Sequence, residues 1–76
     1  MKQLPSLKAR DVIRALKKLG FEESHQKGSH LTLINRATGK RTIIPIHPGK
    51  DIKKPLLRKI IEEDAGVVIS EFLEKL

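Results

Sequence analysis

Hydrophobic residues recur at helical spacing near the start of the chain. Basic residues occupy the positions between them, so the pattern indicates a helix with one apolar face. Ser6 is a favourable N-cap residue, and Gly20 suits the left-handed position that ends many helices. We therefore predict a helix from about residue 7 to 19, whose apolar face is formed by Ala9, Val12, Ile13, Leu16 and Leu19.

Strand-like segments follow this helix. The clearest one alternates, with Leu31 and Leu33 on the same side. Another is rich in β-branched residues, and its Pro45 favours an edge position or a bulge. Gly39 can adopt the positive φ of a tight connection. The predicted strands are residues 21–25, 30–35 and 41–46, joined by turns at 26–28 and 36–40.

A second helix is predicted to begin near Pro55, because proline suits the first helical turn. We expect it to end at Ala65-Gly66 and to be followed by an extended link at 67–69. Ser70 is then expected to cap a short final helix. The apolar stripe of the second helix would be Leu56, Leu57, Ile60 and Ile61, and the tail would pack back through Phe72, Leu73 and Leu76.

Helices with apolar stripes must bury them, and in this chain only the sheet offers a partner. We therefore expect both helices to cover one face of a three-stranded antiparallel sheet. The predicted fold is α+β, a small double-stranded-RNA-binding-like domain of α-β-β-β-α order with a short C-terminal helix. With 76 residues, we expect residues 1–76 to form one domain.

The composition narrows the function. Sixteen Lys and Arg oppose nine Asp and Glu, for a net charge of +7, which favours a polyanionic partner such as nucleic acid. Cysteine is absent, so disulfides and Cys-based zinc sites are excluded. The N-terminal segment lacks a signal-like apolar stretch, and no apolar run approaches a membrane span. We therefore expect a cytoplasmic protein without a membrane partner.

The pairing of the second and third strands decides which side chains meet. We expect Leu31 to face Ile46 and Leu33 to face Ile44, because this register buries both isoleucines beneath the helices. A register shifted by one residue would instead bury Pro45.

This expected register has consequences for the opposite, helix-free face. It places His30 beside His47, and Ile34 beside Ile43. The isoleucine pair is interpreted either as ordinary scattered surface or as a protein-docking patch.

The segment that most clearly suggests catalysis is Lys-Gly-Ser-His at 27–30. RNA carries its own nucleophile, the 2′-OH, and a histidine with a reference pKa of about 6.5 can accept or donate that proton. His30 is the catalytic candidate on this ground, Ser29 would orient substrate, and His47 is an accessory candidate. Cationic side chains could bind phosphate and stabilise its developing charge; those we consider are Lys27, Lys50, Lys53, Lys54 and Arg58.

Simpler interpretations stay open at this point. His30 could be a surface or structural residue, and His47 a turn residue before Pro48. His25, His30 and His47 could in principle bind zinc, but they lack helical i, i+4 spacing and a neighbouring carboxylate. We expect no metal and no cofactor.

The sequence resembles the HicA-type (YcfA-like) family of mRNA interferase toxins over nearly its whole length. The matching elements are Leu4-Pro5 and the helix after it, Lys-Lys-Leu-Gly-Phe at 17–21, Lys-Gly-Ser-His at 27–30, Pro-x-His-x-Gly at 45–49 and Leu-Arg-Lys-Ile-Ile at 57–61. Pro55 departs from the glycine common in such proteins before the second helix.

The resemblance implies a toxin of a type II toxin–antitoxin system. Its activity would be metal-independent cleavage of mRNA, with His30 as the catalytic histidine and a HicB-type antitoxin covering the histidine face. Two alternatives are a non-catalytic double-stranded-RNA-binding module and an interaction protein whose basic surface serves an acidic partner. RNA cleavage by the isolated chain separates the first hypothesis from both.

Overall fold

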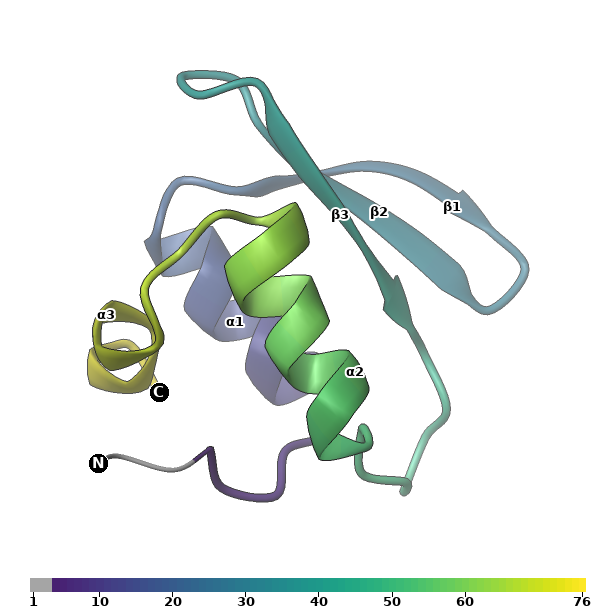
Figure 1. Cartoon of the computed structure of the whole chain (residues 1–76). Helices are drawn as coiled ribbons and strands as arrows, with labels where there is room; N and C mark the ends of the chain where they lie inside the picture. Colours follow the sequence, from purple (N-terminus) through teal and green to yellow (C-terminus); the bar gives the residue numbers. More distant parts are fainter. Residues whose placement is uncertain (1–3) are drawn as a thin grey trace.

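A computed structural model of the chain describes residues 4–76; the N-terminal segment that we expected to lack a signal begins at Met1, outside this range. The three strands form one antiparallel sheet in the order β1-β2-β3, and the helices lie on one side of it (Figure 1). The predicted α-β-β-β-α fold with a C-terminal helix is confirmed. The elements are α1 (Ala9–Lys18), β1 (Glu22–Lys27), β2 (His30–Asn35), β3 (Lys40–Pro45), α2 (Lys54–Arg58), a π-helical segment η1 (Lys59–Asp64) and α3 (Ile69–Glu74).

The core lies between the helices and the sheet. Removing apolar surface from water stabilises the fold by about 25 cal/mol per Å², and every element except β1 contributes to it. The side chains with no more than 1% exposure include Val12, Leu16, Leu33, Ile44, Leu57, Ile60, Ile61 and Phe72. Within residues 4–76, no helix has the length and hydrophobicity that a membrane span requires.

The first helix begins later than predicted. The chain at Leu7 and Lys8 is extended: the Leu7 carbonyl accepts a hydrogen bond from the Ile52 backbone N–H (2.8 Å), and Lys8 bridges to Asp51. Pairing with this distant segment delays the helix until Ala9. The N-cap is Lys8, so the predicted cap at Ser6 is wrong.

The end of α1 is as predicted. Gly20 has a φ of 99°, and the Phe21 N–H donates to the Leu16 carbonyl (3.0 Å) while the Gly20 N–H donates to the Lys17 carbonyl (3.1 Å). These are the two hydrogen bonds of the Schellman motif. A Cβ at Gly20 would lie 3.3 Å from Asn35 Nδ2.

We expect Gly20→Ala to lower the free energy of unfolding by about 1–2 kcal/mol, because an L side chain is strained in this left-handed conformation and its Cβ would also crowd the Asn35 side chain. Urea denaturation measures the loss. Gly28→Ala is the matched control, since Gly28 has a φ of 58° and open space around its would-be Cβ. An equal loss in both variants would contradict a contribution from the Asn35 contact.

The register of β2 and β3 differs from the prediction by two residues. Leu31 pairs with Ile44, and Leu33 with Thr42. A shift of two preserves which residues face the helices, so Leu31, Leu33 and Ile44 are buried as expected. The expected pairs of His30 with His47 and of Ile34 with Ile43 are both wrong, because His30 pairs with Pro45 and Ile34 with Arg41.

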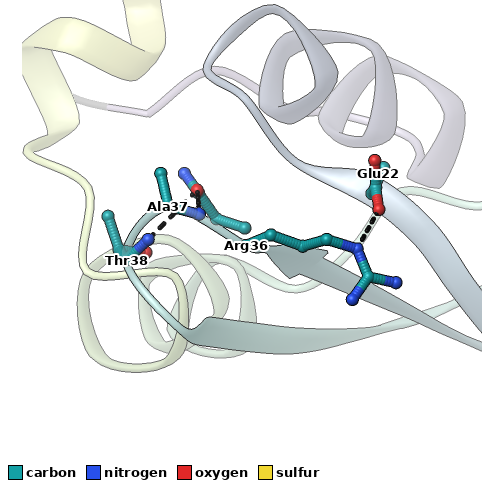
Figure 2. A network of polar contacts seen from close by, with 5 residues as sticks. Glu22, Arg36, Ala37 and Thr38 are labelled. Atoms are coloured by element: carbon teal, nitrogen blue, oxygen red, sulfur yellow. Dashed lines mark hydrogen bonds and ion pairs between the residues drawn. The ribbon is translucent and has the colours of Figure 1, made fainter.

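The turn after β2 explains this register. The Asn35 side-chain oxygen accepts hydrogen bonds from the backbone N–H groups of Ala37 (3.0 Å) and Thr38 (3.4 Å), and Arg36 reaches back to Glu22 on β1 (Figure 2). An asparagine that bonds the backbone two residues ahead starts a turn at its own position. The loop therefore closes over residues 36–39 and β3 begins one residue earlier than predicted.

The strand β1 is longer than predicted and is fully exposed. It continues to Lys27, so the turn contains only Gly28 and Ser29, and the pairing register shifts between Glu23 and His25. Gly28 has positive φ whereas Ser29 does not, which is the pattern of a type II′ hairpin.

The last helices also depart from the prediction. The second helix widens into η1, where the Ala65 N–H donates to the Ile60 carbonyl five residues earlier (2.9 Å), and both Ile60 and Ile61 are buried. Leu56 is 41% exposed instead of buried. The predicted cap at Ser70 is wrong, since α3 begins after Val68; Phe72 packs into the core as predicted, whereas Leu76 is exposed.

Candidate functional site

His30 is the first residue of β2 and its side chain is exposed. Its neighbour Leu31 is buried against the helices, and successive residues of a strand point to opposite faces. His30 therefore projects from the helix-free face, as predicted. Its cross-strand partners there are Lys27 on β1 and Pro45 on β3.

A shallow hollow on this face surrounds one side of the His30 ring. The hairpin turn bounds this hollow. Lys27 and Ser29, two residues predicted to contact substrate, line it together with the candidate catalytic histidine. The full lining is His25, Lys27, Gly28, Ser29, His30, Thr32 and Ile43.

A second hollow lies on the other side of His30, along the outer edge of β3. Its wall includes Ile43 and Pro45 on β3, and Leu56 and Lys59 from the helical side. Ile43 is 51% exposed and Leu56 41% exposed, so the floor beside the imidazole is apolar. Lys59 is held by an ion pair with Asp64 (3.1 Å).

His47 is not part of either hollow. It lies beyond the end of β3, in a third hollow that also contains Lys50 and Lys53. The third hollow adjoins the second because Pro45 and Leu56 line both. A continuous surface thus leads from His30 towards these two lysines, while the predicted contact between His30 and His47 is not formed.

Two other predicted phosphate-binding residues lie farther along the surface. Lys54 and Arg58 line a separate depression with Leu4 and Pro55, and Arg58 forms an ion pair with Glu62 (3.1 Å). They share no hollow with His30.

The surface around His30 carries unneutralised positive charge. Among residues 4–76, the five ion pairs leave ten Lys and Arg side chains without a carboxylate partner, and these include the predicted phosphate-binding residues Lys27, Lys50, Lys53 and Lys54. All four are exposed. In the same part of the chain, no three His, Cys, Asp or Glu side chains are grouped so that they could hold a metal ion.

The sequence prediction missed His25 as a member of this surface. It was assigned to the end of an edge strand, before a turn at 26–28. The two-residue turn at Gly28 and Ser29 instead pairs Lys27 with His30 and His25 with Thr32. A glycine followed by a serine between strands is itself a hairpin signal, and reading it so would have placed His25 on the face of His30.

The sequence model described as HicA toxin of bacterial toxin–antitoxin matches residues 9–67. This chain belongs to the HicA toxin family. The matched range contains α1, the whole sheet and the helix that covers it, and therefore every residue of the hollows around His30. Among curated proteins, no sequence matches the chain.

Membership of the HicA toxin family makes the chain a toxin of a toxin–antitoxin system, and it implies an antitoxin partner. The helix α3 lies outside the matched range, although its Phe72 is completely buried. In this HicA toxin the core therefore extends beyond the matched segment.

Proposed function

We propose that this HicA toxin is a metal-independent endoribonuclease that cleaves mRNA through His30. The observation that carries the proposal is the exposed imidazole on the open sheet face, with Lys27 opposite it across the strand pair. An RNA strand can reach this ring without any rearrangement of the core. A toxin that removes mRNA would arrest growth.

The chemistry needs only what RNA and this surface supply. A histidine can take the proton of the ribose 2′-OH, whose oxygen then attacks the adjacent phosphorus. Cations near the phosphate stabilise the charge that develops there. Lys27 is the cation that pairs with His30 across the two strands. DNA would not be cleaved, because it lacks the 2′-OH.

The RNA path would extend from His30 over the basic side of the molecule. Ser29 shares the hollow of His30 and would orient the phosphate or the ribose. Lys50 and Lys53, at the end of the adjoining hollow, would bind phosphates farther along the strand. Lys54 and Arg58 would continue this path at its outer end.

We propose a HicB-type antitoxin as the inhibitor, bound over the same face. Ile43 and Leu56 are exposed and flank His30 together with Pro45. Apolar side chains gathered beside a polar site are typical of protein contact surfaces. A partner that buries these three residues would also cover the imidazole and block access of RNA.

The purified chain should cleave mRNA fully in the presence of EDTA. The products should carry a 2′,3′-cyclic phosphate or a 3′-phosphate on one fragment and a 5′-OH on the other, because the 2′-oxygen is the nucleophile. Mass spectrometry of a short RNA substrate identifies the termini. Loss of cleavage with the chelator, or fragments ending in 5′-phosphate, would contradict the mechanism.

The same assay distinguishes a pure binding module. A double-stranded-RNA-binding protein would bind duplex RNA with a steep dependence on salt and would leave the substrate intact. Intact RNA under conditions of measured binding would therefore overturn the nuclease proposal.

A further inference from the structure

We propose that His25 is the second proton-transferring residue, acting on the same phosphodiester as His30. This inference rests on the proposed ribonuclease function. Cleavage by the 2′-OH moves two protons, since one leaves the attacking oxygen and another must reach the departing 5′-oxygen. A single imidazole on one side of the phosphate serves only one of these atoms at a time, so a second proton carrier is sought nearby.

The hairpin register brings His25 to the required place. His25 pairs with Thr32, whereas His30 pairs with Lys27 two residues away on each strand. The two histidines are therefore diagonal neighbours on one face of an antiparallel pair, a relation that places residues about 7–8 Å apart across the two strands. Both line the same hollow, and both are exposed.

This spacing suits two groups that flank one phosphate. Each imidazole must come within about 2.6–3.2 Å of its oxygen, and the attacking and departing oxygens lie on opposite sides of phosphorus. Rings several ångströms apart, facing a shared hollow, can approach both oxygens at once. Lys27 lies on the same face, opposite His30 and two residues from His25 on β1, where its ammonium group can stabilise the charge on the phosphoryl oxygens.

The step balances without an added reagent. The 2′-oxygen forms a bond to phosphorus as one imidazole takes its proton, and the bond from phosphorus to the 5′-oxygen breaks as the other, protonated imidazole gives its proton to that oxygen. The products are a 2′,3′-cyclic phosphate and a 5′-hydroxyl. Proton exchange with water then restores both rings.

His47 does not compete for this role. It lies beyond β3 and shares no hollow with His30, although the sequence made it the accessory candidate. The pairing of β1 with β2 thus assigns the second position to a residue that sequence reasoning had left aside.

The test compares His25→Ala and His30→Ala on two RNA substrates. One is ordinary RNA, and the other has sulfur in place of the 5′-oxygen at the cleaved bond, a leaving group that needs no protonation. On ordinary RNA we expect each variant to be slower than wild type by about 10²–10⁴-fold. On the sulfur substrate, the variant that lacks the general acid should cleave at nearly the wild-type rate. The variant that lacks the general base should remain slow.

Glu23→Gln is the matched control, because Glu23 is exposed on the same strand but pairs with Leu33 on the opposite face; it should cleave both substrates at the wild-type rate. Wild-type rates for His25→Ala on ordinary RNA would overturn the inference while leaving the proposed function intact. The inference would also be overturned if each histidine variant lost the same fraction of its cleavage rate on both substrates, because neither residue would then be the acid.

A binding measurement tests, independently of catalysis, whether His25 and His30 contact the same ligand. Uridine 3′-monophosphate is titrated into the labelled wild-type protein while the imidazole resonances are followed by NMR. The resonances of His25 and His30 should shift together with one dissociation constant. A response of His30 alone would overturn the pairing, even if the chain cleaved no RNA and the proposed function had failed.

Discussion

His30→Ala will abolish the toxic effect of the chain on growing cells and will slow RNA cleavage in vitro by about 10²–10⁴-fold, the usual contribution of a positioned acid or base. The fold will survive the change. The His30 side chain is exposed, and among the described residues it donates or accepts no side-chain hydrogen bond, so its removal should alter stability by less than about 0.5 kcal/mol.

Induced expression with growth and mRNA integrity followed together measures this effect. Ser70→Ala is a suitable control, because Ser70 is exposed on α3, caps no helix and lies outside the hollows around His30. The control should be as toxic as wild type. Equal toxicity of the His30 variant at equal expression would remove His30 from the mechanism.

Phe72→Ala will cost about 3–5 kcal/mol of unfolding free energy, because it removes a large and completely buried side chain. Small domains have a total stability of roughly 5–15 kcal/mol, so this single change removes much of what holds the chain folded. The cost is expected even though α3 lies outside the segment matched by the HicA toxin family. Phe72 closes the core against which α1 and η1 pack.

Guanidinium denaturation, monitored by circular dichroism, measures the loss. Leu76→Ala provides the comparison, since Leu76 follows the same helix but is 48% exposed, and it should change stability by well under 1 kcal/mol. A small effect of Phe72→Ala, similar to that of Leu76→Ala, would mean that α3 contributes little to the core.

The architecture could be predicted from the sequence because it depends on the periodicity of the apolar residues. The apolar period of α1 and the alternation of β2 assign each residue to a face, and a face survives an error of two residues in register. Leu31, Leu33 and Ile44 are therefore buried as predicted, and His30 is exposed on the opposite face.

The neighbours of His30 could not be predicted in the same way, because they depend on where the turns between the strands begin and end. The register of β2 and β3 follows from two hydrogen bonds to the side chain of Asn35, whereas hydrophobic burial alone does not distinguish registers that differ by two residues. Likewise, the two-residue turn at Gly28 and Ser29 places His25 on the face of His30, whereas the register of β2 and β3 separates His47 from His30.

Helix starts and the widened turn of η1 were missed for a different reason. The start of α1 depends on the pairing of Leu7 and Lys8 with residues 51 and 52, which are distant in sequence. The exposure of Leu56 accompanies the π-helical segment that follows it. The start of α1 therefore has no local sequence signal, because it is imposed by pairing with a remote segment.

The most direct test of the account is the response to removing one oxygen from the substrate. A short RNA whose cleavage site is known is compared with the same RNA carrying a single 2′-deoxynucleotide on the 5′ side of the cleaved bond. Attack by the ribose hydroxyl predicts that this bond stays intact while other sites are still cut. Cleavage of the deoxy bond at an unchanged rate would show that water or another nucleophile attacks the phosphate, and it would contradict the proposed chemistry of His30.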